Sequence, residues 1–141
     1  MSRDDVLALA RAYFDAINRH DFEQVSASLA PTYVHHSGAG DLDPEAFLAQ
    51  AAKYVASFPD FRYDVVEILP LADGHSVVAR WTMLGTQLGV AFGAAPSGKP
   101  FRSPGMSLHR FEDGHLIEDW EYGDDIAMFE DLGFHLEPPR G

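Results

Sequence analysis

The stretch "SLHRFEDGHLIEDWEYGDD", residues 107–125, contains the clearest fold signal in the chain. Two runs rich in strand-forming residues flank Asp113-Gly114, a dipeptide that accepts the positive φ angles of a two-residue hairpin turn. We therefore expect two antiparallel strands joined at this turn. Five of the last eight residues are acidic, so the pairing of the strands decides which of these acids faces water.

The expected register of the hairpin separates its side chains by face. If Asp113 and Gly114 are the loop residues, His109 lies opposite Glu118. Because successive strand residues point to opposite faces, we expect one face, directed to the interior, to carry His109, Trp120, Tyr122 and Asp124. The other face is expected to meet water and carries Arg110, Ile117, Asp119 and Glu121.

A second hairpin is predicted upstream, where "FRYDVVEIL" (61–69) and "SVVARWTML" (76–84) flank Asp73-Gly74. The same pairing rule places Glu67 opposite Arg80. It also predicts an apolar face formed by Val66, Ile68, Val77, Ala79, Trp81 and Met83. Residues 85–100, with four glycines and two prolines, predict an irregular loop between the hairpins.

Helical periodicity dominates the first 60 residues. Ser2, Asp21 and Asp43 are candidate N-caps of three amphipathic helices, with only a brief extended piece at 32–37 between the second and third. A last short helix is expected from about residue 125. Helices followed by antiparallel hairpins favour an α+β fold in a single domain over residues 1–141, with the helices packed on one face of a curved sheet.

Composition restricts the partners and the compartment. The formal charge of -12 and the lack of a basic cluster argue against nucleic acid as a partner. The chain has no cysteine, which excludes disulfides and thiolate metal sites. No apolar run is long enough to cross a membrane, and the N-terminal residues lack the pattern of a secretion signal, so we expect a cytoplasmic protein.

Several motifs together resemble a known family. "YFDAINRHDFEQVSASLAPTYVHH", "FPDFRYDV", "GTQLGVAFGAAPSGKPF", "HRFEDGHLIEDW" and "DDIAMFEDLG" follow one another in the order found in SnoaL-like polyketide cyclases of the nuclear-transport-factor-like superfamily. The resemblance spans nearly the whole chain. It implies a conical barrel in which a curved, mostly antiparallel sheet wraps around N-terminal helices and encloses an apolar cavity. It also implies a homodimer.

The same resemblance suggests where the chemistry occurs. In these cyclases an aspartate after "IEDW" is the general acid/base of an intramolecular aldol ring closure, and the matching residue here is Asp124. The family often has histidine in a "GTH" triplet, where this chain has Gln87, which forms hydrogen bonds but does not titrate. The aldol chemistry needs no cofactor, because a hydrogen between two carbonyl groups is already acidic.

The candidate site residues combine these arguments. The catalytic candidates are Asp124 and His109, and His109 also has the simpler interpretation of a cross-strand partner of Glu118. The residues expected to bind a hydrophobic small-molecule substrate are His36, Phe58, Trp81, Gln87, Phe92, Met106, Trp120 and Tyr122. We expect no metal site, because adjacent histidines on a strand point to opposite faces. Which of His35 and His36 lines the pocket stays open.

These observations favour a small cofactor-free enzyme of the polyketide-cyclase type, a lyase or isomerase acting on a hydrophobic carbonyl compound. Two alternatives remain open at this point. The first keeps the cavity and the acid but makes the chain a dehydratase or hydrolase of another apolar metabolite. The second is a non-catalytic module that binds a small molecule or mediates dimerisation, because one fold often serves several functions.

Overall fold

The computed structural model describes residues 1–38 and 40–141. In chain order, the elements of these residues are α1 (Arg3–Asn18), α2 (Phe22–Ser28), β1 (Leu29–Ser37), β2 (Gly40–Leu42), α3 (Pro44–Ser57), β3 (Arg62–Pro70), β4 (Ser76–Thr86), β5 (Pro100–Glu112), β6 (His115–Gly123) and α4 (Asp125–Asp131). None of the helices in this described part of the chain is long and apolar enough to span a membrane.

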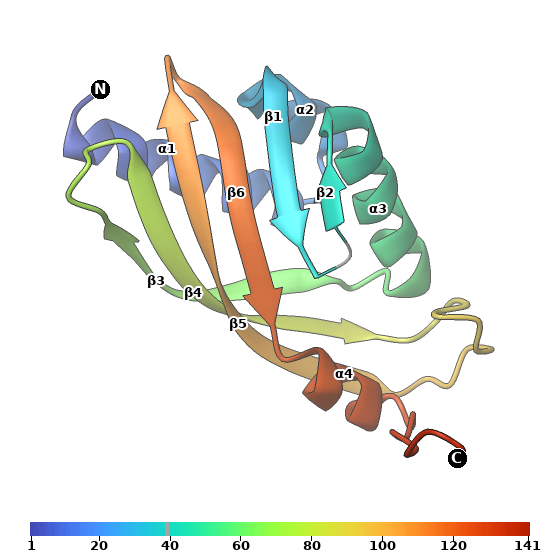
Figure 1. Cartoon of the computed structure of the whole chain (residues 1–141). Coiled ribbons are helices and arrows are strands. Elements are labelled where there is room, and N and C mark those ends of the chain that lie inside the picture. The colour runs from blue at the N-terminus through green and yellow to red at the C-terminus, as the bar shows by residue number, and fades with distance from the viewer. Residues whose placement is uncertain (39) are drawn as a thin grey trace.

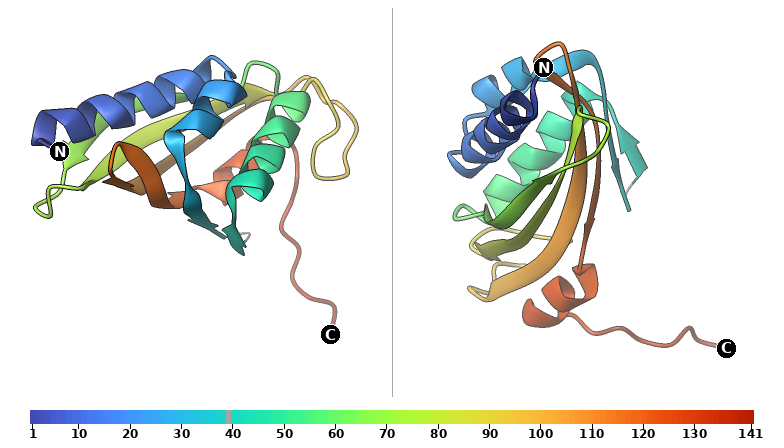
Figure 2. Two further views of the ribbon diagram at one scale, coloured as in Figure 1. Left: turned by 90° about the horizontal axis from the view of Figure 1, so that it is seen from above. Right: turned by 90° about the vertical axis from the view of Figure 1, so that its left-hand side faces the viewer.

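One curved sheet organises the molecule, with the strand order β2-β1-β6-β5-β4-β3. β1 pairs with β6 in parallel, and the other neighbouring strands pair antiparallel. Helices α1 and α3 lie against the concave face of the sheet, as Figures 1 and 2 show. The α+β fold is therefore as predicted, although the sheet stays open between its edge strands β2 and β3.

The predicted helix starts are confirmed, because they depend on local capping chemistry. Ser2 and Asp5 form a reciprocal capping box at α1. Asp21 caps α2, and Asp43 caps α3 with proline at the first helical position. The apolar stripe of α1 is buried against the sheet and consists of Val6, Ala10, Tyr13, Phe14 and Ile17.

The strand after α2 is longer than predicted. Instead of a brief piece at 32–37, β1 runs for nine residues and includes Pro31. The ladder between β1 and β6 is irregular between Leu29 and Val34, so the missing N–H of Pro31 falls where regular pairing is interrupted. The extra length allows β1 to lie along β6.

A β-bulge changes the register of the β5–β6 hairpin. The turn at Asp113 and Gly114 is confirmed by φ angles of 50° and 79°. The register then shifts, because Phe111 pairs with Leu116 but Arg110 pairs with Glu118, which leaves Ile117 as the additional residue.

The expected faces of β6 are therefore wrong beyond the bulge. His109 lies opposite Asp119 rather than Glu118, and Asp119 is only 1% exposed. Asp119 and Glu121 point to the concave side, whereas Trp120 points to the outer face. A one-residue slip reverses every side chain that follows it, because the side-chain period of a strand is two.

The β3–β4 hairpin follows its prediction more closely. Glu67 lies opposite Arg80, and the two side chains form an ion pair of 3.0 Å. The predicted apolar residues of β4 are buried, namely Val77, Ala79, Trp81 and Met83. Val66 is the exception at 54% exposed, because a register shift between Val65 and Glu67 turns it outward.

Gly105 of β5 lies directly beneath the Trp81 indole. A Cβ at this position would lie 2.5 Å from Trp81 Cη2 and 2.6 Å from the carbonyl oxygen of Tyr122. The indole is also fixed at its other end, where Trp81 Nε1 donates a hydrogen bond of 2.9 Å to Ser107 Oγ. Trp81 therefore cannot move aside without breaking a buried contact.

We predict that Gly105→Ala lowers the free energy of unfolding by about 1–3 kcal/mol, the usual cost of overpacking a core. Gly38→Ala is the matched control, because a Cβ there would meet no atom of the described residues within 4 Å. Chemical denaturation of both variants measures the difference. Equal stability of Gly105→Ala and the wild type would contradict the tight packing of Trp81.

Candidate functional site

A cavity of about 190 Å³ lies between the helices and the concave face of the sheet. Its walls are largely aromatic and apolar, and include Tyr13, Phe47, Tyr54, Tyr63, Trp81 and Met83. Three residues with acidic or basic side chains also line it, namely His35, Glu121 and Asp125. The apolar walls are suited to an apolar ligand, and the few ionisable groups provide the reactive chemistry.

Strand alternation in β1 brings His35 into this cavity. His35 is 3% exposed, whereas the next residue, His36, points to the opposite face. His35 Nδ1 lies 2.5 Å from Asp119 Oδ1 and therefore donates a hydrogen bond to the carboxylate. Tyr33 donates its hydroxyl hydrogen to Asp119 Oδ2 over 2.8 Å. Asp119 thus fixes the orientation of the His35 ring and leaves Nε2 directed away from it.

Glu121 lies on the other side of the His35 ring. Its Oε2 is 3.7 Å from His35 Nε2, and its side chain is 23% exposed. Its Oε1 accepts a short hydrogen bond from the Tyr63 hydroxyl. Asp119, His35 and Glu121 therefore form a row from the buried sheet to the cavity, and His35 and Glu121 line the cavity.

The surroundings shift the pKa values of these groups in different directions. Burial raises the pKa of Glu121 and outweighs the opposing effects of His35 and the Tyr63 hydroxyl. Burial lowers the pKa of His35, but the hydrogen bond and charge of Asp119 outweigh it, so the net pKa is raised. A glutamate that binds a proton readily beside a histidine that retains one is suited to proton transfer.

His109, one of the two catalytic candidates, is buried behind this row and is not part of the cavity wall. Its Nε2 lies 2.6 Å from Ser107 Oγ. Its Nδ1 lies 3.6 Å from Asp119 Oδ2 and has no hydrogen-bond partner among the described residues. Ser107 Oγ accepts from Trp81, so its own hydrogen is available for His109 Nε2. Burial lowers the pKa of His109, which fits a neutral ring in a supporting position.

Asp124, the other catalytic candidate, lies outside the cavity. It is exposed and follows the last residue of β6, where its carboxylate accepts a hydrogen bond of 2.9 Å from the backbone N–H of Ala127. Asp124 is thus the N-cap of α4. The expectation that it faces the cavity is wrong, because the bulge at Ile117 changes which residues of β6 point inward.

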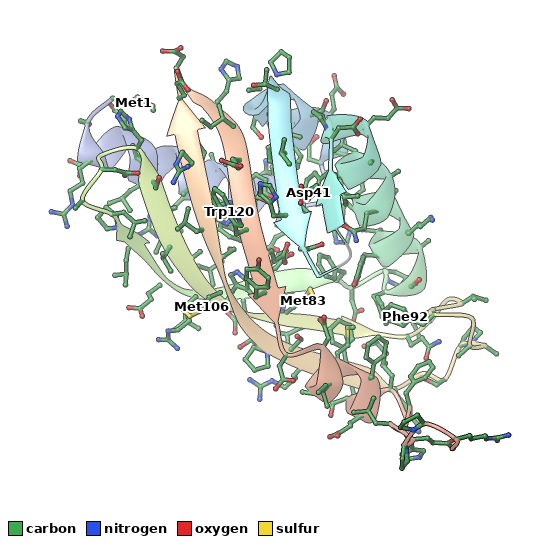
Figure 3. All side chains as sticks on the ribbon, viewed as in Figure 1. Met1, Asp41, Met83, Phe92, Met106 and Trp120 are labelled. Carbon is green, nitrogen blue, oxygen red and sulfur yellow. The ribbon has the colours of Figure 1, made fainter. Side chains whose placement is uncertain are left out.

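The predicted substrate-binding residues are dispersed. Trp81 lines the cavity, and Tyr122 lies at its margin with 62% exposure. Phe58 and Phe92 line a second hollow, an outer groove between α3 and α4. Met106 is 50% exposed on β5 and lines neither hollow. Figure 3 shows Phe92 and Met106 far apart, on different parts of the molecule.

Gln87 stabilises the loop that follows β4. It is 1% exposed, and its Nε2 donates to the carbonyl oxygens of Ala94 and Ala95 over 3.2 and 3.1 Å. Ser97 donates its hydroxyl hydrogen to Gln87 Oε1 over 2.7 Å. Among the described residues, the hydrogen bonds of the Gln87 side chain therefore all go to this loop.

His36 and Trp120 lie together on the outer face of the sheet. Their rings stack with centroids 5.0 Å apart, and the guanidinium of Arg110 lies 5.2 Å from the Trp120 ring centroid. The two ring nitrogens of His36 lie 2.7 Å from carboxylate oxygens of Asp41 and Glu118. These hydrogen bonds raise the pKa of His36. Figure 3 labels Trp120 and Asp41 on neighbouring parts of this face.

The three residues of the central row, His35, Asp119 and Glu121, are not among the predicted site residues. The sequence leaves His35 and His36 as alternatives and predicts that both acids face water. The bulge at Ile117 explains why Asp119 and Glu121 are predicted on the wrong face, because no local sequence pattern predicts a bulge there. One sequence signal was available for His35. Tyr33 and His35 are two positions apart in one strand, so both point to the same face of the sheet.

The described residues, 1–38 and 40–141, contain no group of three or more histidine, aspartate or glutamate side chains arranged to hold a metal ion. The row formed by Asp119, His35 and Glu121 is connected by hydrogen bonds and charge interactions instead.

Comparisons with known proteins agree with this architecture. A family model described as SnoaL-like polyketide cyclase matches residues 7–132. IdmH from Streptomyces antibioticus, a candidate polyketide cyclase, has 27% sequence identity and a TM-score of 0.79, with 95% of this chain and 100% of that chain covered. TsrD from Streptomyces laurentii has 25% identity and a TM-score of 0.80, with 94% and 98% covered.

A third solved structure, AclR from Streptomyces galilaeus, is similar in fold, with a TM-score of 0.86 at 24% identity over 99% of this chain and 91% of that chain. A search of curated proteins finds no match to the chain.

We predict that Asp119→Asn lowers the pKa of His35, because the neutral amide removes the charge that favours the protonated ring. An NMR titration of the histidine rings measures the change. Glu118→Gln is the matched control, since it removes a carboxylate partner of His36 and should lower the pKa of His36 alone. An unchanged pKa of His35 in Asp119→Asn would contradict the pairing.

Proposed function

Because the chain belongs to the SnoaL-like polyketide cyclase family, we propose that it is a cofactor-free acid/base enzyme acting on a hydrophobic carbonyl compound. The reaction is an intramolecular aldol cyclisation or a related lyase or isomerase reaction. The observation that supports this proposal best is the Glu121 carboxyl group in an aromatic cavity, with a raised pKa and with His35 beside it. The likeness to IdmH supports the same reaction class.

In the first step Glu121 acts as the general base. Its carboxylate takes a proton from the carbon next to a carbonyl group, so the C–H bond breaks and an enolate forms. A carboxylate with a raised pKa binds this proton more strongly than an ordinary glutamate does, and the apolar walls exclude competing water. The Tyr63 hydroxyl holds Oε1 and leaves Oε2 available.

His35 stabilises the negative charge that develops on the carbonyl oxygen as Glu121 takes the proton. Its Nδ1 donates to Asp119, so the proton on Nε2 of the charged ring is directed to the cavity side. A cationic donor near the enolate oxygen stabilises it electrostatically. In a cyclisation the enolate carbon then attacks a second carbonyl group of the same molecule, a C–C bond forms, and the new alkoxide takes the proton back from Glu121.

In this proposal Glu121 has the role that the family resemblance gives to Asp124. The two residues are three positions apart, but only Glu121 lines the cavity. Asp124 caps α4 and is exposed to water, outside the apolar walls of the cavity.

We predict that Glu121→Gln lowers the rate of α-proton exchange of 2-tetralone, a bicyclic ketone, by about 10²–10⁴-fold, the usual contribution of a general base. Exchange is measured by proton NMR in D₂O. Asp124→Asn is the matched control and should keep the wild-type rate. The roles would be reversed if Asp124→Asn lost the activity and Glu121→Gln kept it. A wild-type protein that binds the ketone without exchange would favour the non-catalytic module.

We also predict a bell-shaped pH dependence, because the base must be deprotonated and His35 protonated. Activity rises as pH increases through the raised pKa of Glu121 and falls as pH increases through the raised pKa of His35. The Tyr63 hydroxyl lowers the pKa of Glu121, so Tyr63→Phe should move the acidic limb to higher pH.

Tyr54→Phe is the control for this shift. It removes a hydroxyl that lines the same cavity and makes no hydrogen bond to Glu121 in the described part of the chain. Both profiles are measured with the same exchange reaction. A shift of equal size in the two variants would show that Tyr63 has no specific effect on the base.

A further inference from the structure

The cavity that holds Glu121 is small for the ligands of such a site. Its volume of about 190 Å³ lies below the roughly 300–1,000 Å³ that drug-sized ligands occupy in proteins. A compound with several fused rings or a long chain therefore cannot be enclosed completely. If the reacting carbonyl reaches Glu121, the remainder of such a molecule must extend out of the cavity.

An outer groove is available beside the cavity. It has a volume of about 830 Å³ and lies between α3, the loop after β4 and α4. Its lining is mostly apolar and includes Leu42, Ala46, Phe58, Val90, Phe92 and Phe129. Val90 and Phe92 are 64% and 48% exposed, so apolar surface here is open to water.

The cavity and the outer groove adjoin each other. Gln50, Tyr54 and Asp125 line both of them, which makes these three residues a shared boundary. The Tyr54 ring lies 5.6 Å from that of Phe61, a cavity residue, and 6.5 Å from that of Phe92, a groove residue. An apolar molecule crossing this boundary would remain in contact with aromatic rings along its length.

Hydrogen bonds hold the loop after β4 against the end of α3, at the rim of the outer groove. Leu88 and Gly89 donate their N–H groups to the carbonyl oxygen of Ser57, and the Ser57 hydroxyl donates to the carbonyl oxygen of Val90 over 2.7 Å. Phe92 has a positive φ of 51°, which is unfavourable for a bulky residue. The centroid of its ring lies 4.8 Å from the centroid of the Phe129 ring. Such strain is typical of functional sites.

We propose that the outer groove is a second binding subsite, which holds the apolar extension of the same substrate whose carbonyl end lies beside Glu121. The substrate class is thus an elongated carbonyl compound with a compact reacting end and a long apolar chain or ring system. The assignment of the carbonyl end rests on the proposed function, whereas the groove itself is defined by its apolar lining and by the three residues that it shares with the cavity. Gln50 and Asp125 offer hydrogen bonds to a polar substituent between the two parts.

The experiment uses alkyl phenyl ketones from acetophenone to decanophenone, with binding measured by isothermal titration calorimetry. In the wild type, each methylene that enters the groove should tighten binding by about two- to fourfold, as expected for partly or fully buried methylene groups. Val90→Asp places a charge in the groove and should abolish this gain for the long ketones while leaving acetophenone unchanged.

Leu88→Asp is the matched control. Leu88 is 60% exposed on the same loop but does not line the groove, so this variant adds the same charge and should keep the gain. Binding that does not depend on chain length, or an equal loss in both variants, would overturn the proposal. A Val90→Asp variant that changes the oligomeric state instead would identify the groove as a contact between copies, which also overturns it.

The two proposals fail in distinguishable ways. Glu121→Gln should keep the dependence of affinity on chain length, because the groove does not contain Glu121. If the length dependence is lost but Glu121→Gln abolishes exchange, only the second subsite is wrong. If the length dependence is present but exchange does not need Glu121, only the proposed function is wrong. If none of the alkyl phenyl ketones binds, the second subsite is wrong, and the exchange of 2-tetralone still decides the proposed function.

Discussion

The buried carboxylate of Asp119 is the constraint on which the site depends. At 1% exposure it requires hydrogen-bond donors, since an unpaired buried charge is strongly destabilising. The donors are Tyr33 and His35, and both come from β1. The parallel pairing of β1 with β6 therefore satisfies the charge of Asp119. Because side chains alternate along a strand, Glu121, two positions after Asp119 on β6, points to the same face of the sheet as Asp119.

Much of the fold could be predicted, because its signals are local. The N-caps at Ser2, Asp21 and Asp43 and the turn at Asp113-Gly114 depend on neighbouring residues alone, and the structure has all of them. The parallel pairing of β1 and β6 could not be predicted in this way. It joins segments about 80 residues apart, and no local pattern connects the side chains that it brings together, His35 and Asp119.

The candidate site was predicted less well, for a single geometric reason. One additional residue at Ile117 exchanges the two faces of β6. Trp81 lies on a strand without this shift, and it lines the cavity as expected. Trp120 and Asp124 lie beyond the bulge, and neither lines the cavity. The predicted catalytic pair, a carboxylate and a histidine, has the same chemistry as Glu121 and His35. The position of the bulge depends on how the whole sheet packs, so the residues that form it do not predict it.

The acidic stretch at the end of β6 shows how environment separates residues of the same type. Glu118 bonds to His36 on the outer face, and Asp124 caps a helix in water. Asp119 is buried with two donors, whereas Glu121 meets an aromatic cavity that raises its pKa. The surroundings of each acid, and not its residue type, therefore decide what it does. Asp119 holds the His35 ring by a hydrogen bond, whereas in the proposed reaction Glu121 exchanges a proton with the ligand.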